Sequence, residues 1–243
     1  MGTSVEEGPA RAAARVLVAR PGRAPRLVVR LAPADAGRYA ALVRALAPRL
    51  EGALAPGVIA NRLRPDGRLE PWTRARRRWR RRLAEALADP RAAVAVGDVA
   101  ACYPSIGPAA VARSLSAIGA APEVARAVLA MLERLEAGVG AGLPVGPAPS
   151  ALLANAVLTV ADRAVEEHGA AYLRWVDDVV LVGGTARQVR RALDAWRSGL
   201  AAVGLEAHPD KTRVLEGRQA RRELLGPRGR GPSPAARGMM PAP

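Results

Sequence analysis

The stretch YLRWVDDVVLV, residues 172–182, places two adjacent acids, Asp177 and Asp178, inside an apolar run. The residues on either side are typical of short strands, so the acids are expected at the connection of a hairpin. Two-residue hairpin loops favour Asn-Gly or Asp-Gly, which makes Asp-Asp a poor choice for turn formation alone. Carboxylates are seldom surrounded by apolar residues unless they are paired or bind a metal. The stretch therefore predicts a functional hairpin, and the alternative is a solvated turn.

A third acid, Asp98, follows an apolar segment, AVAVG at residues 93–97, that is expected to be a strand. Asp98 shares the parity of Val94 and Val96, which puts it at the mouth of a sheet. If the hairpin lies alongside, two carboxylates about 4 Å apart repel by about 4 kcal/mol at an effective dielectric constant of about 20. Divalent cations remove this repulsion, and hard oxygen ligands select Mg²⁺ or Mn²⁺. Two such ions can activate an attacking hydroxyl and stabilise a leaving pyrophosphate.

The chain carries a net charge of +15. Such a charge favours a polyanionic partner, most often a nucleic acid. The alternative is the compositional habit of a chain rich in Arg, Ala and Pro. Taken together with the three acids, the charge predicts phosphoryl transfer on a nucleic acid.

The length of 243 residues suits one large domain or two small ones. Cys102 is the only cysteine, which excludes an intrachain disulfide and a cysteine-based zinc site. No apolar run approaches the roughly 18 residues of a membrane-spanning helix. We therefore expect a soluble protein in the reducing cytoplasm, with no membrane partner.

An arginine-rich segment, PWTRARRRWRRRLAEALADP, is expected to form a helix between Pro71 and Pro90. Its apolar residues recur near heptad spacing and form one stripe, whereas arginines crowd the other faces. Like charges at this density repel one another unless an anion lies nearby, which favours contact with a phosphate backbone. The alternative is a solvated face. The predicted nucleic-acid contacts are Arg74, Arg77, Arg78 and Arg81.

From Asp98 onward the expected order is strand, helices, strand, strand, helix, strand. This is the ferredoxin-like split βαβ pattern, an α+β fold with an antiparallel sheet and helices on one face. Two short strands, RVLVAR and RLVVRLA, and one helix at residues 36–54 are expected before the arginine-rich helix. Ser150 is expected to cap the long helix that precedes the acid hairpin.

Four segments stand in the order of reverse transcriptase motifs A to D, namely DVAACYPSI, GLPVGPAPSALLANAVL, YLRWVDDVVLV and LEAHPDKTRVL. Over residues 98–217 the chain resembles a bacterial stand-alone reverse transcriptase. The resemblance implies an RNA-directed DNA polymerase that adds dNTPs to the 3′-hydroxyl of a primer on an RNA or DNA template. It also implies abbreviated, mostly helical fingers at residues 1–97, a catalytic palm at 98–217, and a Gly/Pro-rich, disordered tail at 218–243.

The same resemblance assigns roles to the acids and to one tyrosine. Asp98 and Asp177 would be the principal ligands of two Mg²⁺ or Mn²⁺ ions, assisted by the Val99 carbonyl, and Asp178 would be the third acid. Tyr103 falls where the family places a steric gate against the ribose 2′-hydroxyl. The alternative for Tyr103 is an ordinary core tyrosine.

Motifs B and D supply the remaining predicted residues. The resemblance places Gly146, Ser150 and Asn155 against the incoming nucleotide. Lys211 is the only lysine among 37 basic residues, and it stands where motif D places its lysine. Because lysine can release a proton and arginine effectively cannot, Lys211 is predicted to bind the nucleotide and to protonate the leaving pyrophosphate. The alternative is chance placement.

The sequence departs from the family in two respects. Val145 replaces the glutamine that is common in motif B, and no segment of thumb length follows Gly217. We therefore expect a partner subunit or an RNA to take the place of the thumb. Two other classes stay open: a non-catalytic nucleic-acid-binding protein with a palm fold, and a phosphoreceiver signalling domain, which needs a parallel sheet. A role in antiviral defence is an analogy only.

Overall fold

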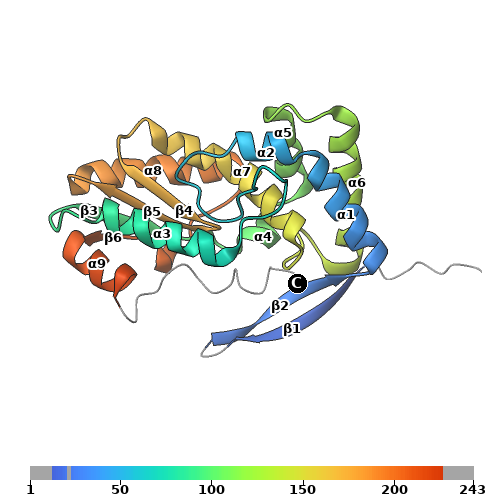
Figure 1. Ribbon diagram of the computed structural model, residues 1–243, viewed down its shortest axis with the longest axis horizontal. Coiled ribbons are helices and arrows are strands. Elements are labelled where there is room, and N and C mark those ends of the chain that lie inside the picture. Colours follow the sequence, from blue (N-terminus) through green and yellow to red (C-terminus); the bar gives the residue numbers. More distant parts are fainter. Residues whose placement is uncertain (1–12, 21–22, 227–243) are drawn as a thin grey trace, which may run out of the picture.

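The computed structural model describes residues 13–20 and 23–226, and Figure 1 shows the arrangement of their elements. A four-stranded antiparallel sheet lies at the centre, with the strand order β4-β5-β3-β6. The strands are short and rich in valine, as suits strands that are buried on both faces. Their bounds are β3 Ala93–Gly97, β4 Ala171–Trp175, β5 Asp178–Gly183 and β6 Arg213–Glu216.

The connections of this sheet confirm the predicted split βαβ pattern. A helical layer leads from β3 to β4, a tight turn joins β4 to β5, and one helix leads from β5 to β6. Because every pairing in this sheet is antiparallel, the phosphoreceiver alternative is wrong. The helices are α4 Cys102–Ser105, α5 Pro108–Ala117, α6 Pro122–Val139, α7 Ala148–Glu166 and α8 Ala186–Ala202.

One face of the sheet packs against α7 and α8 (Figure 1). A Cβ atom on Gly97 would lie 2.8 Å from the indole ring of Trp196, so β3 and α8 approach as closely as a glycine allows. Residues with the parity of Gly97 therefore face α8, because side chains alternate along a strand. Val96 and its partner Val180 face the opposite side.

The opposite face also carries helices, α3 Trp72–Ala86 and α9 Gly217–Leu225. Trp175 of β4 meets the rings of Trp72 and Trp79 edge-on, with centroids 6.2 and 5.9 Å apart. The sequence predicted helices on one face of the sheet, whereas the structure has helices on both faces. Residues 218–225, which were expected in the disordered tail, instead form most of α9, whereas 227–243 lie outside the described residues.

The region before the arginine-rich helix begins with an antiparallel ribbon, β1 Ala13–Arg20 and β2 Arg23–Leu31, which extends away from the body (Figure 1). The expected helix at residues 36–54 is two helices, α1 Pro33–Ala45 and α2 Ala47–Gly52. The break at Leu46 follows from Pro48, which has no N–H for the carbonyl four residues earlier. The two predicted strands are confirmed.

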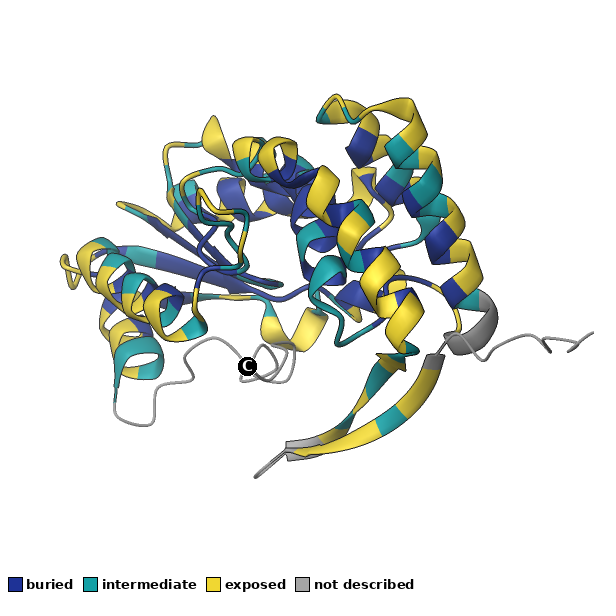
Figure 2. Cartoon of the chain, turned by 45° about the vertical axis from the view of Figure 1, so that its right-hand side comes forward, coloured by how far each residue is buried: buried dark blue, intermediate teal, exposed yellow. Residues whose placement is uncertain are grey.

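A single hydrophobic cluster joins these parts, from Tyr39 and Val43 of α1 through the sheet to Trp196 of α8. Figure 2 shows the buried residues along the strands and the inner helix faces, and exposed residues along the ribbon. Within residues 13–20 and 23–226, no helix has both the length and the apolar character needed to cross a membrane.

Candidate active site

Three acids lie at one end of the central sheet. Asp98 follows β3 directly and is buried. Gly97 of β3 pairs with Val179 of β5, and continuing this register by one residue sets Asp98 across from Asp178. Asp177 directly precedes Asp178 in the adjoining turn. All three acids therefore lie at the same end of the sheet, as the sequence predicts.

The acid hairpin differs by one residue from the prediction. Trp175 pairs with Asp178, so the two-residue loop consists of Val176 and Asp177 instead of Asp177 and Asp178. Val176 has φ = 59°, whereas Asp177 is not among the residues with positive φ. A loop with positive φ at its first residue alone favours glycine there, and a β-branched residue in that region is strained. Strain of this kind is often found at functional sites.

Asp98 and Asp177 repel each other electrostatically. Burial, and after it the negative charge of Asp98, raise the pKa of Asp177 to about 6. The positive charges of Arg26 and Lys211 act the other way. Arg26 and Lys211 are therefore the cations that act on Asp177 at this end of the sheet. Arg26 lies on β2, so the ribbon brings a basic residue to the acids that sequence reasoning did not single out.

Lys211 lies directly at the first acid. Its Nζ is 2.9 Å from Oδ1 of Asp98, and its side chain is 55 % exposed. A short 3₁₀ turn, Pro209–Lys211, presents the lysine after the chain has passed beside Asp98, where the His208 N–H donates to the Asp98 carbonyl at 2.7 Å. The structure thus brings the predicted lysine and the predicted acid together.

The carbonyl group of Val99 points towards the acid hairpin, as the hydrogen bonds around it show. Val99 pairs with Ala207 in an antiparallel bridge, in which Ala100 donates to Glu206 and His208 donates to Asp98. These bonds make Val99 and Ala207 a non-hydrogen-bonded pair, so the N–H and C=O of Val99 point away from the Glu206–His208 segment. Since β5 lies on the other side of β3, the Val99 carbonyl points to the side of the acid hairpin.

Tyr103 is enclosed beside the acids. Its ring is buried, and its hydroxyl has no hydrogen-bond partner within the described part of the chain. Burial raises the pKa of this phenol well above its ordinary value. A buried tyrosine hydroxyl usually finds a partner, so the unsatisfied group calls for an explanation. The Tyr103 carbonyl accepts a hydrogen bond of 2.8 Å from Leu143, which fixes the motif B loop against α4.

Gly146 connects the motif B loop to the ribbon. It has φ = 124°, and a Cβ atom there would lie 2.6 Å from Cγ1 of Val28 on β2. The neighbouring Val145 carbonyl accepts a hydrogen bond of 2.7 Å from Val29. Only glycine combines this backbone conformation with such a close approach. The residue that replaces the family glutamine therefore holds the base of the ribbon through its backbone.

Ser150 and Asn155 have interior partners. Helix α7 begins at Ala148, so Ser150 does not cap it, and its buried hydroxyl lies 3.1 Å from Oη of Tyr39. The Asn155 amide donates to the Ala60 carbonyl at 3.1 Å, and its Oδ1 accepts from Arg174 at 2.9 Å. Contact of either side chain with a nucleotide stays a prediction.

A buried ion pair beneath the hairpin escaped sequence reasoning. Arg174 of β4 and Asp162 of α7 are both fully buried, with Nε 2.8 Å from Oδ1. A signal was present, because Arg174 stands between the apolar Leu173 and Trp175 in a strand. A charge in such a position needs a buried partner. The partner lies on a different element, so the sequence did not show which acid it was.

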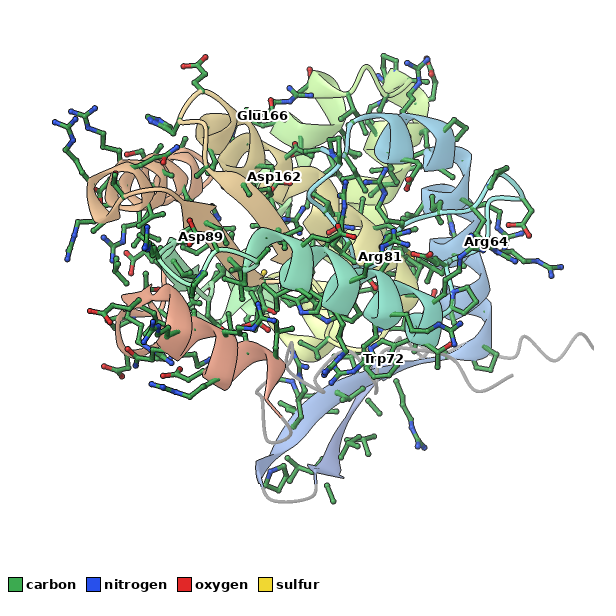
Figure 3. All side chains as sticks on the ribbon, turned by 60° about the vertical axis from the view of Figure 1, so that its left-hand side comes forward. Arg64, Trp72, Arg81, Asp89, Asp162 and Glu166 are labelled. Atoms are coloured by element: carbon green, nitrogen blue, oxygen red, sulfur yellow. The ribbon has the colours of Figure 1, made fainter. Side chains whose placement is uncertain are left out.

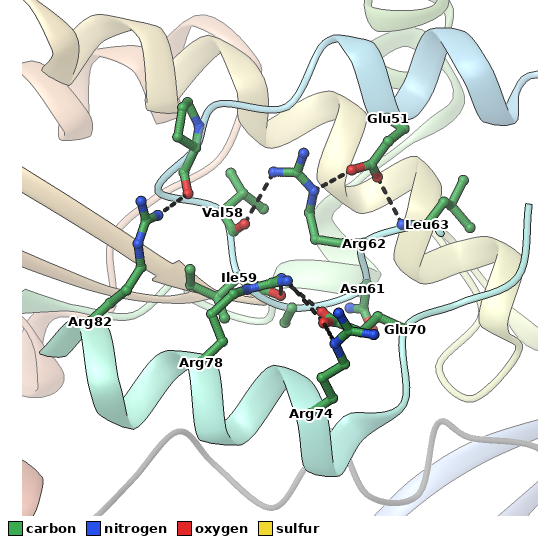
Figure 4. A network of polar contacts seen from close by, with 12 residues as sticks. Glu51, Val58, Ile59, Asn61, Arg62, Leu63, Glu70, Arg74, Arg78 and Arg82 are labelled. Atoms are coloured by element: carbon green, nitrogen blue, oxygen red, sulfur yellow. Dashed lines mark hydrogen bonds and ion pairs between the residues drawn. The ribbon is translucent and has the colours of Figure 1, made fainter. Parts of the chain in front are cut away.

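The arginine-rich helix borders a groove of about 470 Å³, closed on its other side by the loop after α2. Figure 3 shows Trp72 at the start of α3, Arg81 further along it and Arg64 on the facing loop. Figure 4 shows that arginine side chains of the helix bind a carboxylate and backbone carbonyls of the loop. The lining residues are Glu51, Pro56, Val58, Arg62, Leu63, Arg64, Pro65, Glu70, Arg74, Arg78, Arg81 and Arg82.

The four predicted nucleic-acid contacts divide into two kinds. Arg78 is half-buried and binds Glu70 at 2.8 Å and the Ile59 carbonyl at 2.9 Å, so it holds the loop to the helix (Figure 4). Arg74 and Arg81 are each 70 % exposed, with long ion pairs of 3.4 and 3.6 Å. Arg77 is exposed on the same helix. Exposed pairs of this kind are weak and can exchange for other anions.

Within residues 13–20 and 23–226, no three Asp, Glu, His or Cys side chains are grouped closely enough to hold a metal on their own. Asp98 and Asp177 repel each other electrostatically, which a cation between them would relieve. Mg²⁺ commonly takes one or two protein carboxylates and completes its coordination with water and substrate phosphates. The donor set fits such an ion, with the Val99 carbonyl as a third oxygen.

A family model described as reverse transcriptase (RNA-dependent DNA polymerase) matches residues 55–227. The match covers the sheet, the acid hairpin, Lys211 and the arginine-rich helix. No curated protein matches the sequence.

Proposed function

Because the chain belongs to the reverse transcriptase family, whose members are RNA-directed DNA polymerases and thus nucleotidyltransferases, we propose that it extends a primer by two-metal phosphoryl transfer. The family acts on a nucleic-acid template-primer and dNTPs and depends on divalent metal ions. The observation that carries the proposal is the placement of Asp98 directly after β3 and of Asp177 in the β4–β5 turn, at the same end of the antiparallel sheet. Two carboxylates that repel each other are stabilised by a cation of high charge density.

Asp98, Asp177 and the Val99 carbonyl would hold Mg²⁺ or Mn²⁺, with Asp178 as a further acid at the edge. Bound there, the two ions supply an activated primer hydroxyl and neutralise charge on the transferring phosphate. The chain itself places the carboxylates: Asp98 by the end of β3 and Asp177 by the turn at Val176. In the substrate-free protein, the positive charge of Lys211 offsets the negative charge of Asp98.

Lys211 has a second proposed role, as the donor of a proton to the leaving pyrophosphate. Lys211→Arg keeps the charge beside Asp98 but removes a group that can release a proton. If Lys211 is the donor, this variant loses about 10²–10⁴-fold in single-turnover rate, with little change in nucleotide affinity. Near wild-type chemistry in Lys211→Arg, together with damage to both binding and rate in Lys211→Ala, would show that its charge alone matters.

The surroundings of the nucleotide follow from the ribbon and the motif B loop. We assign the sugar to Tyr103, whose buried ring and unsatisfied hydroxyl lie beside Asp177. Arg26 of β2, whose charge acts on Asp177, is suited to the triphosphate. Gly146 allows the ribbon to approach this space closely.

The nucleic acid is assigned to the groove beside α3, where Arg74, Arg77 and Arg81 present exposed guanidinium groups. Arginine forks match phosphate oxygens, and contacts of this kind do not depend on sequence. Arg78 supports the groove wall by holding Glu70 and the Ile59 carbonyl. Substitutions of the exposed arginines therefore test nucleic-acid binding, whereas substitution of Arg78 would also disturb the groove wall.

Primer extension on RNA and DNA templates tests the proposal, with the dNTPs offered singly and together. We expect Mg²⁺- or Mn²⁺-dependent extension that is lost in Asp177→Asn. Asp194→Asn, an exposed acid on α8, is the matched control and should extend normally. Binding of template-primer without any extension, in either metal, would overturn the proposal in favour of a non-catalytic palm-fold protein.

A further inference from the structure

The Arg174 guanidinium is a buried charge with every nitrogen in use. Nε and Nη2 bind the two carboxylate oxygens of Asp162 at 2.8 Å each. Nη1 donates to Asn155 Oδ1 at 2.9 Å and to the Val176 carbonyl at 2.7 Å. The Tyr172 hydroxyl donates to the same Asp162 carboxylate. Arg174 and Asp162 are both fully buried, so this cluster lies in the interior between β4 and α7.

Stability alone is a weak reason for such a cluster. Replacing a buried ion pair by well-packed apolar residues is often neutral or stabilising, because desolvating two charges is costly. The Asp162 pair satisfies only two of the three guanidinium nitrogens. The third reaches the acid turn, which suggests a role in the geometry of that turn.

The bond to Val176 acts on a strained peptide. Val176 has φ = 59°, a conformation that β-branched residues avoid, and its carbonyl belongs to the peptide group that leads into Asp177. Holding that carbonyl fixes the plane of the peptide and thus the direction in which the Asp177 side chain leaves the turn. We propose that Arg174 is a positioning residue that locks the turn so that Asp177 faces Asp98. This inference rests on the proposed roles of those two acids.

The same residue joins the turn to the loop that borders the arginine groove. The Arg174 N–H donates to the Gly57 carbonyl at 2.9 Å, and its carbonyl accepts from Ile59 at 2.9 Å. Asn155, which binds the guanidinium, also donates to the carbonyls of Ala60 and Asn61. Arg174 therefore ties one wall of the groove and the acid turn to a common support.

The test compares Arg174→Lys with Tyr172→Phe. Lysine keeps the charge but cannot bind Asp162 through two nitrogens and reach Val176 as well. Tyr172→Phe also removes a donor to Asp162 but leaves the bond to Val176 in place. We expect Arg174→Lys to lower the single-turnover rate and raise the Mg²⁺ requirement, by about 10–100-fold as for other supports of metal ligands. Affinity for template-primer and the KM for dNTP should stay near wild type.

A second readout needs neither metal nor substrate. In the metal-free protein, amide hydrogen exchange at Val176 and Asp177 should become faster in Arg174→Lys and stay unchanged in Tyr172→Phe. This measurement tests the role of Arg174 even if the wild-type protein extends no primer, so the two proposals can fail separately. Equal exchange in the two variants would overturn the inference, as would equal losses of rate.

A third test asks whether a second substitution restores the activity lost in Arg174→Lys. Glycine adopts positive φ without strain, so Val176→Gly should relieve the need for a clamp. The double variant Arg174→Lys, Val176→Gly should therefore recover most of the rate lost by Arg174→Lys, and no recovery would contradict the clamp. Should Arg174→Lys fail to fold, Asp162→Asn loosens the guanidinium while keeping an acceptor, and the same pattern of a lower rate and faster exchange is expected.

Discussion

Asp177 owes its properties to its place in a turn, where burial, neighbouring charges and backbone strain act on it. Partial burial and the charge of Asp98 disfavour its ionised form, whereas Lys211 and Arg26 favour it. Val176 adds a strained peptide immediately before it. A carboxylate held in this way is ready to bind a cation, because the cation removes the repulsion that the fold imposes.

This repulsion predicts a pH dependence of stability in the metal-free protein. Because the folded-state pKa of Asp177 is raised from 3.8 to about 6, its contribution to stability is fully present below pH 3.8 and is lost as the pH rises through 6. Each unit of pKa difference corresponds to about 1.4 kcal/mol. Urea denaturation with a chelator should show a smaller loss of stability over this range in Asp177→Asn than in wild type. Asp194→Asn should behave as wild type, and identical curves for all three proteins would contradict the coupling.

Tyr103 predicts a change in sugar discrimination. If its ring excludes the 2′-hydroxyl, Tyr103→Ala should raise the use of rNTPs relative to dNTPs, whereas Tyr103→Phe keeps the barrier and should not. Truncating a buried aromatic ring costs about 3–5 kcal/mol of stability, so the ratio of kcat/KM values is the measurement, not the absolute rate. An unchanged ratio in active Tyr103→Ala would make Tyr103 an ordinary core residue.

Helix α3 serves two surfaces at once. Its apolar side, with Trp79 and Leu83, packs into the core and sets Trp79 against Trp175 of β4. Its other side carries the arginines of the groove. The loop after α2 is held to the helix by Arg78 and to the edge of β4 by Gly57, where a Cβ atom would come within 2.3 Å of the Tyr172 carbonyl. One wall of the groove is therefore attached both to α3 and to the central sheet.

The exposed arginines of α3 predict a salt effect. Replacing Arg74, Arg77 and Arg81 by Gln should weaken binding to all nucleic-acid sequences alike. It should also reduce the slope of log K against log salt by roughly 0.7–0.9 per lost phosphate contact. The matched control replaces three exposed arginines on the far side of the sheet, Arg187, Arg190 and Arg191 of α8. An equal change of slope in both triple variants would mean that only net charge matters.

A single core extends from the helices near the ribbon, through the sheet, to the layer behind it. Tyr39 of α1 is hydrogen-bonded to Ser150 of α7, and Asn155 of α7 is hydrogen-bonded to the loop before α3. The regions predicted as fingers and palm are therefore expected to unfold together, because neither can separate without exposing buried side chains.

Cooperative unfolding can be measured with the tryptophans that the chain supplies. Trp72, Trp79 and Trp175 lie on one side of the sheet, and Trp196 lies on the other. Urea transitions followed by tryptophan fluorescence and by far-ultraviolet circular dichroism should coincide. A fluorescence transition that clearly precedes the loss of helix would mean that the two sides of the sheet unfold separately.

Sequence patterns alone determined the strands, most helices and the identity of the acids. Alternating and helical periodicities are local, and an acid pair in an apolar hairpin violates local preferences strongly enough to be noticed. The solitary Lys211 was identified by the same kind of contrast, and the structure places it 2.9 Å from Asp98. The sequence did not predict which two residues form the hairpin loop, because the pairing of Trp175 with Asp178 sets the turn at Val176.

Partnerships between distant residues were decided only by the tertiary structure. Ser150 was expected to cap a helix but is hydrogen-bonded to Tyr39. The sequence did not show that Asn155 is hydrogen-bonded to Arg174 and Ala60. Arg78 supports a wall, although its sequence context is the same as that of its exposed neighbours. The physical reason is common to these cases: a buried polar group must find a partner, and which partner it finds depends on the packing of elements far apart in the chain.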